Sequence, residues 1–153
     1  MPATTFSWPP QLARHSAYRL TADGKEVEVL DAGCGALVML EGTEAVSLDI
    51  TAAERATPLG EVCVKPLSKQ MAAKVEDRAI RFTLPGPADV LVEIPGEPDL
   101  FVFYGAPLED PPESDAPNVT RFRAGQVYNV GDRFVRSGEH IVIEGGAVVC
   151  GSI

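Results

Sequence analysis

Short apolar segments separated by turn-forming residues recur along most of the chain, and this spacing restricts the possible folds more than any other feature. Residues 79–84 show the pattern clearly, because Ile80, Phe82 and Leu84 alternate with polar neighbours. A period of two buries one face of a β-strand and leaves the other in water. Asp23-Gly24 lies between two such segments and favours a tight hairpin turn.

The segments predict an antiparallel β-sandwich rather than a fold with helices. We predict strands at residues 17–20, 25–30, 36–40, 45–50, 61–65, 79–84, 89–94 and 100–104. Residues 100–104 form an unbroken apolar run, which is typical of a central strand buried on both faces. Residues 69–77 have fair helix propensity but lie between two strands, so we interpret them as an extended or loop segment.

The amino-acid composition changes at Pro107. Residues 1–106 form the predicted sandwich, and residues 107–117 are acidic and proline-rich, which is typical of a surface linker. Residues 118–153 contain short apolar runs that meet at Gly145-Gly146, with Gly151 after the second run. Brief strands with tight glycine corners are typical of a solenoid coil, so we interpret this region as the first coil of a truncated β-helix.

The charge restricts the partners. Lys and Arg number 13 and Asp and Glu number 22, which gives a formal net charge of −9. Nucleic acid and anionic membranes are bound mainly through clustered cations, so we expect neither as a partner. A neutral polysaccharide is compatible with this charge, whereas an acidic one such as pectate would need a local basic groove.

The cysteines do not form a disulfide framework or a metal motif. Cys34, Cys63 and Cys150 are widely spaced and odd in number, which predicts free thiols, with a single Cys34–Cys63 disulfide as the alternative. We expect no cofactor and no metal. The first residues lack a cationic segment followed by an apolar run, and no apolar stretch approaches the ~20 residues that span a bilayer, so we expect a soluble chain without a signal peptide.

Five segments carry a resemblance to a known family: residues 16–20 with the Asp-Gly-Lys turn that follows, and residues 64–68, 101–109, 118–122 and 143–151. On these segments the chain resembles the N-terminal region of right-handed parallel β-helix glycoside hydrolases of the dextranase and polygalacturonase type. In such enzymes a β-sandwich and a linker precede the coils. The resemblance implies an antiparallel β-sandwich followed by the start of a right-handed parallel β-helix.

The resemblance also implies a role in polysaccharide degradation without a catalytic residue in this chain. The aspartates of such enzymes lie on later coils, and no Asn-Thr-Asp, Gly-Asp-Asp or Gly-His-Gly occurs here. We therefore expect a non-catalytic accessory domain that caps the beginning of the β-helix. We expect carbohydrate as a partner through the parent enzyme. The exposed C-terminal strand edge could also pair with a second copy of the chain. The alternatives are a stand-alone carbohydrate-binding module and a protein-interaction module.

Individual side chains give weaker signals. The carboxylate pairs Glu139/Glu144, Asp110/Asp115 and Asp49/Glu54 are interpreted as solvated surface, and His15 and His140 as exposed or hydrogen-bonded residues. The rings proposed to contact carbohydrate are Trp8 and Tyr104, with Trp8 alternatively pinning the N-terminal arm to the sandwich. Phe101 and Phe103 share one strand face and are interpreted as core packing.

Overall fold

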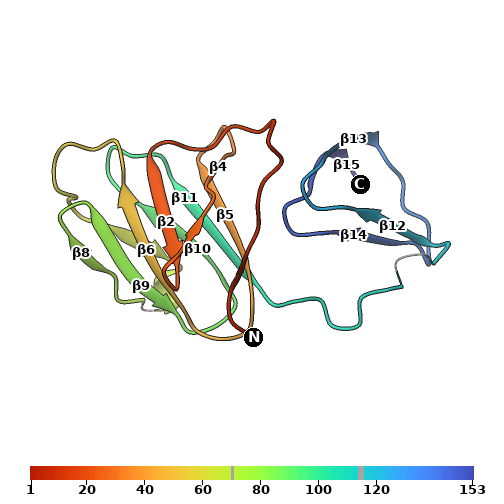
Figure 1. The fold of residues 1–153 in the computed structure, drawn as a ribbon, viewed down its shortest axis with the longest axis horizontal. Coiled ribbons are helices and arrows are strands. Elements are labelled where there is room, and N and C mark those ends of the chain that lie inside the picture. Colours follow the sequence, from red (N-terminus) through yellow and green to blue (C-terminus); the bar gives the residue numbers. More distant parts are fainter. Residues whose placement is uncertain (70, 114–115) are drawn as a thin grey trace. The chain divides into compact units, whose positions relative to one another are not determined.

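The computed structural model describes residues 1–69, 71–113 and 116–153 of the chain (Figure 1). Its residues group into two compact units. The first comprises Met1–Phe6 and Leu12–Pro107, and the second comprises Ser7–Gln11 and Leu108–Ile153. The sequence prediction placed all of residues 1–106 in one sandwich domain, whereas the short segment Ser7–Gln11 belongs to the second unit by its contacts.

One sheet of the first unit has the strand order β1-β5-β11-β10-β7, with β4 paired to β5 as well. These strands are β1 (Thr4–Thr5), β4 (Leu30–Asp31), β5 (Ala36–Glu41), β7 (Cys63–Lys65), β10 (Ala88–Glu93) and β11 (Leu100–Gly105). Neighbouring strands are antiparallel except β5 and β11, which run parallel with Val38 opposite Val102. We refer to this as the first sheet.

The second sheet of this unit has the order β3-β2-β6-β9-β8 and is antiparallel throughout. Its strands are β2 (Tyr18–Ala22), β3 (Lys25–Val27), β6 (Val46–Ala52), β8 (Lys74–Glu76) and β9 (Ala79–Leu84). Leu67–Lys69 form one short 3₁₀ turn, and β8 lies within the stretch interpreted as extended or loop. Gln70, which belongs to that stretch, lies outside the described residues.

The predicted strand 25–30 is divided between the two sheets. It gives β3 to the second sheet and β4 to the first. Val29 and Leu30 are neighbours in sequence, yet both are buried. Strict alternation would have exposed one of them, but the chain crosses between the sheets here and passes over the core. The hairpin formed by β2 and β3, with its turn at Asp23-Gly24, was predicted correctly.

One apolar cluster, formed by the inner faces of both sheets, holds the sandwich together. Val38, Val46, Ile50, Ile80 and Val92 are completely inaccessible to solvent. The predicted β-sandwich is therefore confirmed. The prediction for β11 is wrong in one respect, because only its inner face is buried; Phe103, on the outer face, is 38% exposed.

Two buried tyrosines predict how the sandwich responds to alkaline pH. The hydroxyl of Tyr18 donates to the Pro98 carbonyl, and that of Tyr104 donates to the Glu44 carbonyl at 2.7 Å. Burial is the main cause that raises the pKa of both phenols above the ordinary value of 10. The folded state thus holds these protons more tightly than the unfolded state does.

We expect the stability due to these two tyrosines to be fully present below pH about 10 and to fall as the pH rises further. Urea unfolding followed by circular dichroism at stepwise alkaline pH measures this loss. In Tyr104→Phe the slope of stability against pH should be smaller. An equal slope in the variant would show that Tyr104 titrates alike in both states.

The second unit contains two stacked coils. The strands are β12 (Val119–Phe122), β13 (Val127–Asp132), β14 (His140–Ile143) and β15 (Val148–Ser152). β14 pairs in parallel with β12, and β15 pairs in parallel with β13. This region therefore holds two coils of a parallel β-helix, where the sequence interpretation counted one.

The coils repeat every 21 residues, with Val119 opposite His140 and Val127 opposite Val148. The corner glycines repeat too, since Gly125 and Gly146 both have positive φ and the Gly125 amide donates to the Gly146 carbonyl at 3.0 Å. The carboxylate of Glu144 accepts from the Ala124 amide at 3.0 Å and ties the corners together. The two corners, Arg-Ala-Gly and Glu-Gly-Gly, were the available sequence signal for this repeat.

Candidate functional site: a polar groove on the second sheet

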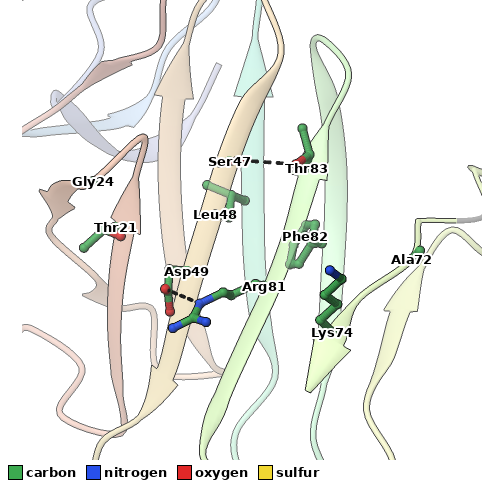
Figure 2. Close-up of a pocket in the computed structure, with 10 residues that line it drawn as sticks. All are labelled: Thr21, Gly24, Ser47, Leu48, Asp49, Ala72, Lys74, Arg81, Phe82 and Thr83. Atoms are coloured by element: carbon green, nitrogen blue, oxygen red, sulfur yellow. Dashed lines mark hydrogen bonds and ion pairs between the residues drawn. The ribbon is translucent and has the colours of Figure 1, made fainter. Parts of the chain in front are cut away.

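A groove of about 610 Å³ lies on the outer face of the second sheet (Figure 2). Its volume is within the range of ligand sites in proteins. It extends across β2, β6 and β9 to the edge strand β8. The lining residues are Thr21, Gly24, Ser47, Leu48, Asp49, Ala72, Lys74, Arg81, Phe82 and Thr83.

Strand alternation explains why the floor of this groove is polar. Leu48 and Phe82 are buried in the sandwich core, so their neighbours Asp49 and Arg81 face outward. The register then brings outward residues of four strands into one row. Asp49 lies between Thr21 and Arg81, and Arg81 lies opposite Lys74.

The arginine in this row organises the charges around it. Arg81 Nε donates to Asp49 Oδ2 at 2.6 Å, and its Nη1 donates to Glu76 Oε2 at 3.3 Å. The hydrogen bond to Asp49 is the main cause that raises the pKa of the Arg81 guanidinium. Further along, the Ser47 and Thr83 hydroxyls lie 3.3 Å apart. Figure 2 shows this contact as a dashed line between β6 and β9. These exposed pairs contribute little to stability, but they present both donors and acceptors at the surface.

The described lining of the groove contains one carboxylate, Asp49. Glycoside hydrolysis needs one carboxyl group that gives a proton and a second that acts as base or nucleophile. Asp49 is paired with Arg81, and the same arginine also pairs with Glu76, which is not part of the groove lining. The arrangement can hydrogen-bond the hydroxyl groups of a ligand.

The other carboxylates considered from the sequence have structural partners or lie apart. Glu139 accepts from the Arg136 amide at 2.9 Å in the turn before β14, and Glu144 binds the corner at Ala124 after the same strand. Asp49 pairs with Arg81 rather than with Glu54. Asp110 has positive φ at a bend in the segment after the sandwich, and Asp115 lies outside the described residues.

The two histidines belong to different units. His15 accepts a hydrogen bond from the Ala17 amide at its Nδ1 and stacks at a tilt against Tyr18. His140 is an exposed residue at the start of β14 in the other unit.

The two rings proposed for carbohydrate contact are buried. Trp8 is 5% exposed and Tyr104 is 1% exposed, so neither presents a ring face to solvent. The Tyr104 side chain lies in the sandwich core, and Trp8 groups with the second unit. The exposed ring of the sandwich that sequence reasoning assigned to the core is Phe103. The alternation of β11 was the signal that could have identified it.

Metal ligands, cysteines and membrane-spanning helices are other possible functional features. Within residues 1–69, 71–113 and 116–153, no group of three or more His, Cys, Asp or Glu side chains could hold a metal ion. Cys34, Cys63 and Cys150 are free thiols. The same residues include no helix with the length and apolarity needed to cross a membrane.

Comparison with known proteins shows a shared fold. No protein-family model matches the chain, and no curated protein matches it by sequence. Among solved structures, the chain is similar to Dex49A from Penicillium minioluteum with a TM-score of 0.66 and 15% sequence identity. The match covers 97% of this chain but 44% of that one, so the chain spans less than half the length of its structural neighbour. This chain therefore shares an all-β fold with part of a larger protein.

Proposed function

We propose that this chain is the non-catalytic N-terminal part of a polysaccharide-degrading glycoside hydrolase, in which later β-helix coils hydrolyse the glycosidic bond. The observation that carries the proposal is the order of its parts. A β-sandwich is followed by parallel coils with a 21-residue repeat. Support for the proposal comes from the similarity of the fold to Dex49A, a dextranase, over 97% of this chain. The identity of 15% supports the fold, and the function is our inference from it.

The second coil supports the idea of a longer stack. Each coil strand has a single described partner, so β14 and β15 each leave one edge unpaired. Ile143 on β14 is 51% exposed. Solenoid coils bury their stacking faces only against neighbouring coils. Further coils would pair these strands and cover Ile143.

The side chains of this chain support an accessory rather than a catalytic role. Asp49 and Glu76 share Arg81, and Glu139 and Glu144 accept backbone hydrogen bonds. These four carboxylates therefore have partners within the chain rather than standing as free pairs across a ligand. The sandwich would assist folding, substrate contact or both, while later coils carry the acid and the base.

Hydrolysis by the product of the complete reading frame tests the proposal. We expect that product to release reducing ends from a polysaccharide such as dextran, and the isolated chain 1–153 to release none. Pectate and starch serve as comparison substrates. Activity in chain 1–153 would show that it carries its own catalytic site. A reading frame that adds no further coils, or a full product inactive on every polysaccharide, would refute the proposed function.

A further inference from the structure

The outer face of the first sheet carries an apolar surface that the core does not use. Its rows follow from the register: Phe101 lies between Leu37 and Leu91, and Phe103 lies between Met39 and Asp89. Phe101 and Phe103 both face outward because Val102 and Tyr104, their neighbours on β11, fill the core. We call the outward surface around these two rings the phenylalanine platform.

A second groove lies directly on this platform. It has a volume of about 570 Å³, and its lining includes Lys65, Leu67, Asp89, Leu91, Phe101 and Phe103. Phe103 is 38% exposed and Leu67 is 69% exposed. The apolar floor thus remains open to solvent, although it contains side chains that ordinarily pack in protein interiors.

The backbone beneath the platform holds one ring in place. A Cβ atom at Gly35 would lie 3.2 Å from Phe101 Cε2 and 2.6 Å from the Asp99 carbonyl oxygen. Glycine at this position therefore lets the ring lie close against the chain before β5. Phe101 and Phe103 are two residues apart on one strand, so their rings are offset by about 7 Å along the same face.

Charged groups lie at the border of this floor rather than within it. Lys65 pairs with Glu93 at 2.7 Å, and the exposed carboxylate of Asp89 flanks Phe103. With Asp89 and Glu93 against Lys65, the border is net acidic, as is the chain with its charge of −9. A polyanion would be repelled here.

We propose that the phenylalanine platform binds a neutral glycan chain, with sugar rings stacked on Phe101 and Phe103 and hydroxyl groups bonded to Lys65 and Asp89. A pyranose ring has an apolar face of C–H groups and an edge of hydroxyl groups, and this groove pairs an apolar floor with a polar border. An open groove accommodates a chain that extends past both ends. The site rests on the proposed function for its ligand class, but it is separate from the hydrolytic step.

Retardation of chain 1–153 in native gels that contain dextran tests the platform. We expect the wild type to be retarded, and Phe103→Ala to bind about tenfold more weakly, because a stacked aromatic anchor dominates such contacts. Phe103→Tyr should retain binding, since it keeps the ring. Phe134→Ala, which removes a ring 90% exposed in the second unit, is the matched control and should bind like the wild type.

Several results would overturn the platform. These are no retardation of the wild type, equal retardation of Phe103→Ala, or retardation by polygalacturonate instead of dextran. A dimer in analytical ultracentrifugation that Phe103→Ala disperses would show that a second copy occupies the face. Thermal unfolding confirms that each variant is folded. If the platform fails while the complete gene product hydrolyses polysaccharide, the proposed function stands and this site alone is refuted.

Discussion

Replacing Trp8 with alanine is expected to unfold the coils of the second unit while leaving the sandwich folded. Trp8 is 5% exposed and lies in the segment Ser7–Gln11, which groups with the coils. Truncating a buried tryptophan costs about 3–5 kcal/mol. A unit of about fifty residues has a total stability of about 3–8 kcal/mol, so this loss is comparable with the whole.

Hydrogen exchange followed by mass spectrometry measures this effect region by region. In Trp8→Ala, the amides of β12 to β15 should exchange much faster, while those of β6, β9 and β11 keep their protection. Phe134→Ala removes a ring that is 90% exposed in the same unit and should leave exchange unchanged. Unaltered protection of the coils in Trp8→Ala would show that the N-terminal segment does not support them.

Replacing Gly151 with alanine is expected to separate β15 from β13 at the position where Gly151 pairs with Gly131. A Cβ atom at Gly151 would lie 2.3 Å from the Gly131 carbonyl oxygen and 2.9 Å from the Gly131 nitrogen. Both atoms belong to the backbone of the paired strand and cannot rotate away. Gly151 also has a φ of +137°, which side chains rarely adopt. We expect a loss of about 2–4 kcal/mol from the combined overpacking and strain.

Urea unfolding followed by tryptophan fluorescence measures this loss, because Trp8 is the single tryptophan of the chain and belongs to the second unit. Gly138→Ala is the matched control. Gly138 has a φ of +86°, but a Cβ atom there would meet nothing within 4 Å. Gly138→Ala should therefore lower the free energy of unfolding by only about 1 kcal/mol, which is the cost of backbone strain. Equal losses in the two variants would contradict close stacking at Gly151.

The sandwich could be predicted from the sequence to a large extent because its strands alternate strictly. Ile80, Phe82 and Leu84 are buried as their period of two requires. The prediction was wrong where tertiary packing breaks that period. Val29 and Leu30 are both buried because the chain changes sheet between β3 and β4.

The outward-facing residues of the sandwich were harder to predict. The five apolar residues 100–104 do not show by pattern alone which side of the strand faces water. Phe101 and Phe103 were assigned to the core, and Phe103 is exposed. The polar groove was not predicted, since Thr21, Asp49 and Arg81 come from three strands that only the register brings together. The second coil was missed because its strands share little side-chain identity with the first, and only the glycine corners repeat.

Interstrand nuclear Overhauser contacts within residues 119–152 test the stacked coils most directly. If these residues are the start of a parallel β-helix, backbone protons should be close in pairs 21 residues apart, such as Thr120 with Ile141 and Tyr128 with Val149. The residue numbers of successive pairs should rise together along both strands. Pairs in which one number rises as the other falls, or pairing of these residues with an edge strand of the sandwich, would contradict the coils and the glycoside hydrolase proposal built on them.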